Sequence, residues 1–122
     1  MLIFNIGSYE DFIQKTREYK SVIVNISGVW CKPCIALKPM LEPFLAVIDE
    51  ADSVYLKIDN SIYEDNIKFE KFFKVNKIPY FGFIKDGLLQ ESFVSGDFAY
   101  VSKRLHKLVS TRIDFIKVEE ME

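Results

Sequence analysis

The residues best suited to covalent chemistry are Cys31 and Cys34, the only cysteines of the chain, which lie within the sequence WCKPC at residues 30–34. A disulfide between them would close a loop too short to restrain much unfolded chain, so it would be a weak structural crosslink. A zinc site normally needs a fuller tetrahedral set of ligands, and His106 is the single histidine. The spacing therefore favours reversible thiol–disulfide exchange over a structural or metal-binding pair.

Thiol–disulfide exchange requires a thiolate, because the protonated thiol of an ordinary cysteine is a poor nucleophile. We expect Cys31 to begin a helix, where backbone N–H groups and the helix dipole stabilise a negative charge, and Lys32 adds a nearby cation. Pro33 fits the start of that helix without losing a hydrogen bond and stiffens the loop. Cys34, one turn further, is expected to be more buried and less acidic. Cys31 is thus the predicted attacking thiol and Cys34 the resolving thiol.

The elements that position this pair follow from the periodicity of apolar residues. Strands are predicted at residues 2–6, 21–27, 53–59, 80–85 and 88–94. Helices are predicted at residues 8–19, 34–51, 62–75 and 98–112. Ser8 and Asp97 are the expected helix caps, Pro39 predicts a kink, and Asp86-Gly87 favours a tight hairpin turn.

This order predicts an α/β fold of three layers, α/β/α, with a central mixed five-stranded sheet. One domain is expected over residues 1–112, with residues 113–122 as a C-terminal tail or a helix extension. The phenylalanines at 69, 72 and 73 are interpreted as core, because no phosphate-binding glycine loop accompanies them. No nucleotide cofactor is expected.

Composition excludes several classes of partner. Sixteen basic and eighteen acidic side chains give a formal charge of -2, which predicts attraction neither to nucleic acid nor to a membrane surface. No uncharged apolar run is long enough to span a bilayer. The first residues, MLIFNIGSYEDF, lack the basic and small-residue features of a secretory signal, so a soluble cytoplasmic protein is expected.

The chain resembles the thioredoxin family over roughly residues 2–110. The resemblance is carried by WCKPC, by Ile78-Pro79 ahead of a predicted strand, and by further positions in thioredoxin order. Those positions are Val24-Asn25-Ile26, Pro39, Lys85-Asp86-Gly87 and Gly96.

This resemblance implies a thioredoxin fold, a cis peptide bond before Pro79, and substrate backbone pairing beside Ile78. It also implies an apolar contact surface that includes Trp30, although from the sequence alone Trp30 could be core and Pro79 an ordinary trans proline. The substrate-contacting positions implied are Trp30, Lys32, Pro33, Ile78, Pro79 and Gly96. The redox-active disulfide itself is the only redox group expected, with no other cofactor and no metal.

The chain departs from the family pattern in two places. Asn25 stands where typical thioredoxins have a buried aspartate, and an amide cannot accept the proton of the resolving thiol as a carboxylate can. Lys32 replaces the commoner glycine between the cysteines and adds a positive charge to the surface that meets substrate. Lys57 resembles the family's lysine near that buried position, so Asn25 and Lys57 are expected to modulate the site.

The sequence thus predicts a thiol–disulfide oxidoreductase that reduces protein disulfides through a mixed disulfide at Cys31, resolved by Cys34. The expected electron donor is an NADPH-dependent thioredoxin reductase, and the expected state is a monomer. Two alternatives stay open: a thioredoxin-like binding module with weak turnover, favoured by Asn25, and a disulfide oxidase or isomerase.

Overall fold

The computed structural model describes the backbone of residues 1–121 and the side chains of residues 1–109. Its strands lie at the predicted positions. They are β1 (Leu2–Ile6), β2 (Ser21–Ser27), β3 (Ser53–Asp59), β4 (Tyr80–Lys85) and β5 (Leu88–Val94). Within the described residues they form one sheet in the order β1-β3-β2-β4-β5. The first three strands are parallel, and β4 and β5 are antiparallel additions.

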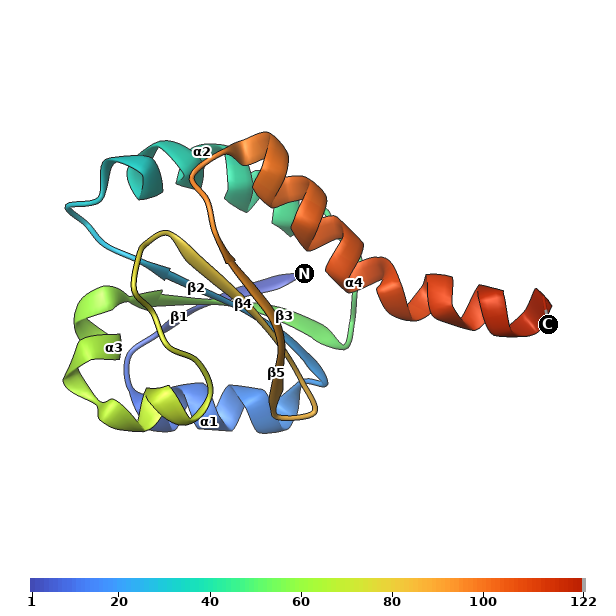
Figure 1. The fold of residues 1–122 in the computed structure, drawn as a ribbon, viewed down its shortest axis with the longest axis horizontal. Helices are drawn as coiled ribbons and strands as arrows, with labels where there is room; N and C mark the ends of the chain where they lie inside the picture. The colour runs from blue at the N-terminus through green and yellow to red at the C-terminus, as the bar shows by residue number, and fades with distance from the viewer. Residues whose placement is uncertain (122) are drawn as a thin grey trace.

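Helices cover both faces of this mixed sheet, as the sequence predicted (Figure 1). They are α1 (Tyr9–Glu18), α2 (Lys32–Ala46), α3 (Asn60–Asp65), the 3-10 helix η1 (Ile67–Lys71) and α4 (Phe98–Met121). Figure 1 shows α2 and α4 on one face of the sheet and α1 and α3 on the other. The predicted caps are present, since Ser8 Oγ accepts from the Asp11 N–H and Asp97 Oδ1 from the Ala99 N–H, each at 3.1 Å.

Two predicted helices differ from the structure. The helix expected at 62–75 is wrong: α3 ends at Asp65 and η1 begins at Ile67, because Asn66 is extended and its side chain caps the Lys68 N–H at 3.0 Å. The helix expected at 34–51 begins earlier and ends at Ala46. Beyond Ala46 the Ile48 N–H bonds to the Leu45 carbonyl at 3.1 Å, a tighter turn that ends the helix.

The hairpin between β4 and β5 is confirmed. Asp86 and Gly87 have φ angles of 52° and 79°, the pair of positive values that a type I′ turn requires. At the C-terminal end of the chain, α4 continues to Met121 through the segment predicted as a tail or a helix extension. The side chains of that segment lie outside the described residues.

Two hydrophobic clusters sandwich the sheet, and alternate residues of β2 belong to different ones. Val22, Val24 and Ile26 pack with the rings of α1, α3 and η1, whereas Ile23 packs with α2 and α4. Because side chains alternate between the faces of a strand, Asn25 shares the α2 face with Ile23. A polar side chain therefore interrupts the core beneath the start of α2.

Candidate active site

The cysteine pair lies where β2 passes into α2. The Cys31 N–H donates to the Gly28 carbonyl at 3.1 Å, which closes the turn after the strand. Cys31 is the N-cap of α2: its carbonyl accepts from the Ile35 N–H at 3.0 Å, and its sulfur accepts from the Cys34 N–H at 3.3 Å. The Cys31 sulfur thus occupies the N-terminal end of a helix, where the dipole and free N–H groups favour negative charge.

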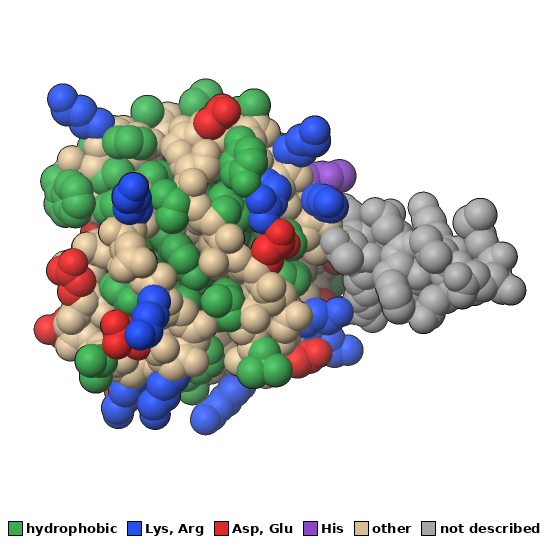
Figure 2. All heavy atoms as spheres, in the orientation of Figure 1, with side chains coloured by type: hydrophobic (Ala, Val, Ile, Leu, Met, Phe, Trp, Pro, Cys, Tyr) green, Lys and Arg blue, Asp and Glu red, His purple; other side chains and the backbone are tan. Residues whose placement is uncertain are grey.

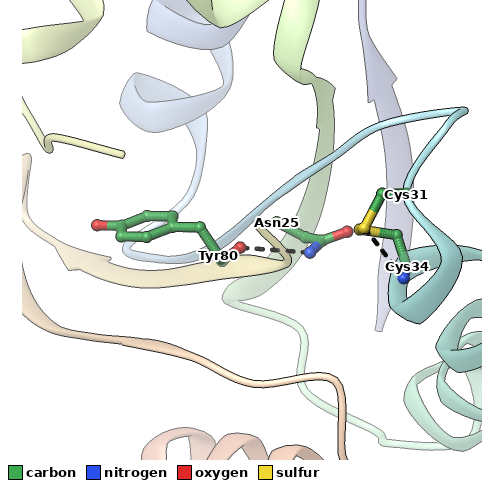
Figure 3. The surroundings of a disulfide bond; sticks show 4 residues. All are labelled: Asn25, Cys31, Cys34 and Tyr80. Atoms are coloured by element: carbon green, nitrogen blue, oxygen red, sulfur yellow. Dashed lines mark hydrogen bonds between the residues drawn. A yellow bond between two sulfur atoms is a disulfide. The ribbon is translucent and has the colours of Figure 1, made fainter. Parts of the chain in front are cut away.

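Cys31 and Cys34 form a disulfide, with their Cα atoms 5.3 Å apart (Figure 3). Cys31 is 5% exposed and Cys34 is 8% exposed. The expectation that Cys34 is the more buried residue is therefore wrong for the oxidised protein, in which the Cys31 sulfur caps the first turn of α2. In the oxidised protein, Cys31 and Cys34 differ mainly in their position in the helix: Cys31 is the N-cap, and Cys34 lies in the first turn.

The loop before α4 packs directly on the segment between the cysteines. A Cβ placed on Gly96 would lie 2.8 Å from Pro33 Cβ, so only glycine fits this contact. Pro33 stands within the first turn of α2, as predicted, and Lys32 beside it is exposed. Residues far apart in the sequence, Pro33 and Gly96, are thus brought together at the site.

Trp30 lies on the surface and not in the core. Its side chain is 69% exposed, and that of the neighbouring Val29 is 83% exposed. Gly28 supports the indole, because a Cβ at Gly28 would lie 3.1 Å from the Trp30 ring and 3.2 Å from Ile78 Cδ1. Trp30 and Ile78 therefore flank the same backbone position next to the disulfide.

The Ile78–Pro79 segment forms the other side of the site. The peptide bond between these residues is cis. The Pro79 carbonyl accepts from the Ser95 N–H at 3.3 Å, whereas the backbone of Ile78 bonds to no described residue. The backbone of Ile78 therefore keeps its hydrogen-bonding groups available beside the disulfide.

Asn25 lies beneath the disulfide in β2 and is 8% exposed. Its Nδ2 donates to the Tyr80 carbonyl at 3.3 Å, and in Figure 3 the amide oxygen faces the cysteines. An amide in this place accepts a hydrogen bond but does not take up a proton near neutral pH. Residue 25 of β2 therefore places an amide, and not a carboxylate, beneath the disulfide.

Lys57 is the neighbour of Asn25 in the parallel register of β2 and β3. Its Nζ lies 2.9 Å from Glu42 Oε2, and both side chains are mostly buried. Sequence reasoning missed Glu42, although it is the single acidic residue of α2 and thereby a signal. Burial, together with the charge of Glu42, raises the pKa of the Tyr55 hydroxyl beside this pair.

A cleft of about 520 Å³ lies next to Cys34. Its lining includes Asn25, Cys34, Lys38, Glu42, Lys57 and Pro79. Among the side chains that the structure describes, no group of three or more His, Cys, Asp or Glu could hold a metal ion. The cleft therefore brings polar groups from α2, β2 and β3 to the inner side of the cysteine pair.

Comparisons with known proteins agree with this geometry. The family described as Thioredoxin matches residues 1–119. A thioredoxin of Gallus gallus is 27% identical over 111 residues, which cover 88% of this chain and all of the relative. A thioredoxin of Coprinus comatus is 27% identical over 82 residues, which cover 67% of this chain and 74% of the relative. The chain belongs to the thioredoxin family.

A solved structure is similar throughout the fold. The germline-specific thioredoxin protein Deadhead of Drosophila melanogaster superposes with a TM-score of 0.73 at 23% identity, covering 86% of this chain and 98% of the other. The family and the Cys31–Cys34 pair support thiol–disulfide oxidoreductase chemistry in general, and proteins of this family act on disulfide substrates. None of the described helices combines the length and apolar character of a membrane span.

Proposed function

We propose that this protein reduces disulfides in other proteins. The Cys31 thiolate attacks one sulfur of the substrate disulfide, forms a mixed disulfide and releases the first substrate thiolate, which takes up a proton. Cys34 then loses its proton and attacks the Cys31 sulfur, which releases the second substrate thiolate and leaves the Cys31–Cys34 disulfide. Two electrons pass from the dithiol to the substrate. The observation that carries the proposal is the placement of Cys31 as the N-cap of α2, with a backbone N–H on its sulfur.

The surroundings of Cys31 support a protein substrate. Exposed Trp30 and Val29 offer apolar contact beside the disulfide, and the unpaired backbone of Ile78 offers hydrogen bonds to an extended segment. The absence of a side chain at Gly96 lets its loop pack directly on Pro33, and Pro79 lines the cleft beside Cys34.

Regeneration of the dithiol requires a donor of two electrons. We assign that role to an NADPH-dependent thioredoxin reductase, and we place the reaction in a reducing cytoplasm with the protein acting as a monomer. The Cys31–Cys34 pair is the only redox group that this cycle uses.

Trapping the mixed disulfide tests the proposal directly. The Cys34→Ser variant should retain a protein substrate through Cys31, because the resolving thiol is gone, and the adduct should appear by mass spectrometry and disappear with dithiothreitol. The Cys31→Ser variant is the matched control and should trap nothing. Reduction of protein disulfides by the wild-type protein together with an absence of any Cys34→Ser adduct would contradict this order of attack.

One observation favours a second function. Because Asn25 cannot take the proton of Cys34 as a carboxylate would, the chain could bind partners through the same surface and turn over weakly. The steady-state rate of disulfide reduction with a thioredoxin reductase distinguishes a reductase from a binding module, because rapid turnover excludes the binding module. An oxidase or isomerase is distinguished by the reduction potential, which should lie near about -270 mV for a reductase and near or above about -180 mV otherwise.

A further inference from the structure

Three lysines belong to the segments that form the site. Lys32 stands between the two cysteines, Lys38 lines the adjoining cleft, and Lys77 directly precedes Ile78. All three residues are exposed. None of them forms an ion pair or a side-chain hydrogen bond with another residue of the described part of the chain. Their charges are therefore available to a bound molecule.

The acidic groups near the site are already engaged. Glu42 is paired with Lys57 at 2.9 Å. Asp59 accepts from the Ser61 N–H at 2.9 Å and Asp97 from the Ala99 N–H at 3.1 Å, so each carboxylate faces the N-terminal end of a helix. These contacts hold the three carboxylates in place, whereas the side chains of the three lysines have no such partner among the described residues.

An apolar centre lies among these lysines. Val29, Trp30 and Ile35 are 83%, 69% and 56% exposed. Figure 2 shows hydrophobic side chains together with Lys and Arg side chains at the end of the molecule where α2 begins. An apolar centre with a charged rim is the usual composition of a protein docking surface, and the sign of the rim selects the partner.

We propose that this surface selects disulfide proteins whose reactive cysteine is flanked by acidic residues. The inference rests on the proposed function, because it names the substrate class of the same site. Local charge must carry the selection, because the whole chain has a formal charge of only -2 and so offers acidic substrates no long-range attraction. A preference for acidic substrates is therefore diagnostic of the lysine rim.

The test uses three disulfide-linked peptides that are identical except for Glu, Gln or Lys on either side of the cysteine. The reduced protein is mixed with each peptide in a single turnover, and the rate constant of peptide thiol release is divided by that for dithiothreitol, which corrects for the intrinsic reactivity of each disulfide. We expect a corrected Glu-to-Lys ratio of about tenfold at roughly 10 mM ionic strength, falling below about twofold near 1 M salt.

The lysines themselves are tested by substitution. The combined variant Lys32→Gln, Lys38→Gln, Lys77→Gln should bring the ratio near one, and each single variant should lower it in part. Lys85→Gln is the matched control: Lys85 is exposed and lies at the end of β4 remote from the cysteines, so it should leave the ratio unchanged.

Each outcome decides the inference. A wild-type ratio near one or below one at low salt overturns it, as does a preference that survives the combined substitution. Reduction of all three peptides without preference removes the inference and leaves the proposed function standing. A wild-type protein that reduces none of the peptides, the Gln form included, removes both.

Discussion

The two faces of the sheet differ in what covers them. On the face of α1, α3 and η1, rings pack on rings: Phe12 lies 5.4 Å from Phe69 and 5.8 Å from Phe73 between centroids. On the face of α2 and α4, the apolar cluster is interrupted near the disulfide by Asn25 and by the Lys57–Glu42 pair. The first face is packed mainly with aromatic rings, whereas on the second face Asn25, Lys57 and Glu42 line the cleft beside Cys34.

The two faces should therefore contribute differently to stability and to chemistry. A fully apolar core contributes mainly to the free energy of unfolding, since burial of rings is favourable and nondirectional. A core that admits polar groups is less stabilising for its area, but it can hold charges and protons next to a reacting sulfur. Substitutions on the first face should therefore change stability, and substitutions on the second should also change chemistry.

The largest effect is expected on the face of α1, α3 and η1. Phe69→Ala removes a fully buried ring that contacts Tyr9, Phe12 and Tyr63, and it should lower the free energy of unfolding by about 3–5 kcal/mol. Urea unfolding followed by circular dichroism measures the change. Phe44→Ala on the other face is the control, with roughly half the loss, because Phe44 is only partly buried. A loss for Phe44→Ala equal to that for Phe69→Ala would contradict the larger contribution expected of the fully buried ring.

A substitution on the face of α2 and α4 should change the rate. Asn25→Asp places a carboxylate beneath the disulfide, which should speed the attack of Cys34 on the mixed disulfide by about 100-fold, at the low end of general-base effects. Release of substrate from a preformed mixed disulfide measures this step. Asn5→Asp, in the same row of the sheet but exposed on β1, should give no gain.

The same substitution has a consequence for pH dependence. Burial raises the pKa of a carboxyl group above its value in the unfolded chain, so Asn25→Asp should be more stable at pH values below the unfolded pKa and lose stability as pH rises through the folded pKa. Urea unfolding of Asn25→Asp across about pH 4–8, relative to the wild-type protein, measures this loss. An unchanged rate combined with flat stability would show that position 25 does not communicate with the sulfurs.

A smaller effect is expected where the loop before α4 meets the cysteine segment. Gly96→Ala puts a methyl group 2.8 Å from Pro33 Cβ, and relief of this clash should lower the free energy of unfolding by about 1–2 kcal/mol. It should also lower the rate of disulfide reduction, because Pro33 lies between the cysteines. Gly7→Ala has open space around the new methyl group and should change neither quantity. Loss of stability without loss of rate would separate this contact from the site.

The smallest effect compares an ion pair on each face. A double-mutant cycle with Glu42→Gln and Lys57→Met should give a coupling energy of about 1 kcal/mol, because these side chains are largely buried. The pair of Asp11 and Lys15 on α1 should give about 0.3 kcal/mol, because its charged groups are 3.6 Å apart and belong to one helix. A coupling energy no larger for Glu42–Lys57 than for Asp11–Lys15 would contradict this difference.

Local patterns predicted much of this structure. The strands, the Asp86-Gly87 hairpin and the caps at Ser8 and Asp97 follow from periodicity and from turn and capping chemistry that act over a few residues. The helix at 62–75 failed because the side chain of Asn66 offered its own cap and divided the apolar pattern into two short turns. Apolar spacing alone does not reveal such a competing hydrogen bond.

The sequence predicted the parts of the site that depend on residues close together in the chain. It did not predict the parts that depend on packing between distant elements. The spacing of Cys31 and Cys34 indicated the redox pair and its place at the end of a strand. Glu42 was missed, because its contact with Lys57 joins α2 to β3 and depends on how far the helix lies over the sheet. The burial of Cys31, which is 5% exposed against 8% for Cys34, likewise depends on packing that the spacing does not reveal.

The exposure of Trp30 has a spectroscopic consequence. Trp30 is the single tryptophan of the chain, so all indole emission originates beside the disulfide and none originates in either core. Emission should therefore respond to oxidation, reduction and peptide docking without any engineered probe. It should respond only weakly to global unfolding, because the indole is already hydrated in the native protein, so indole fluorescence is a reporter of the redox cycle and a poor monitor of folding.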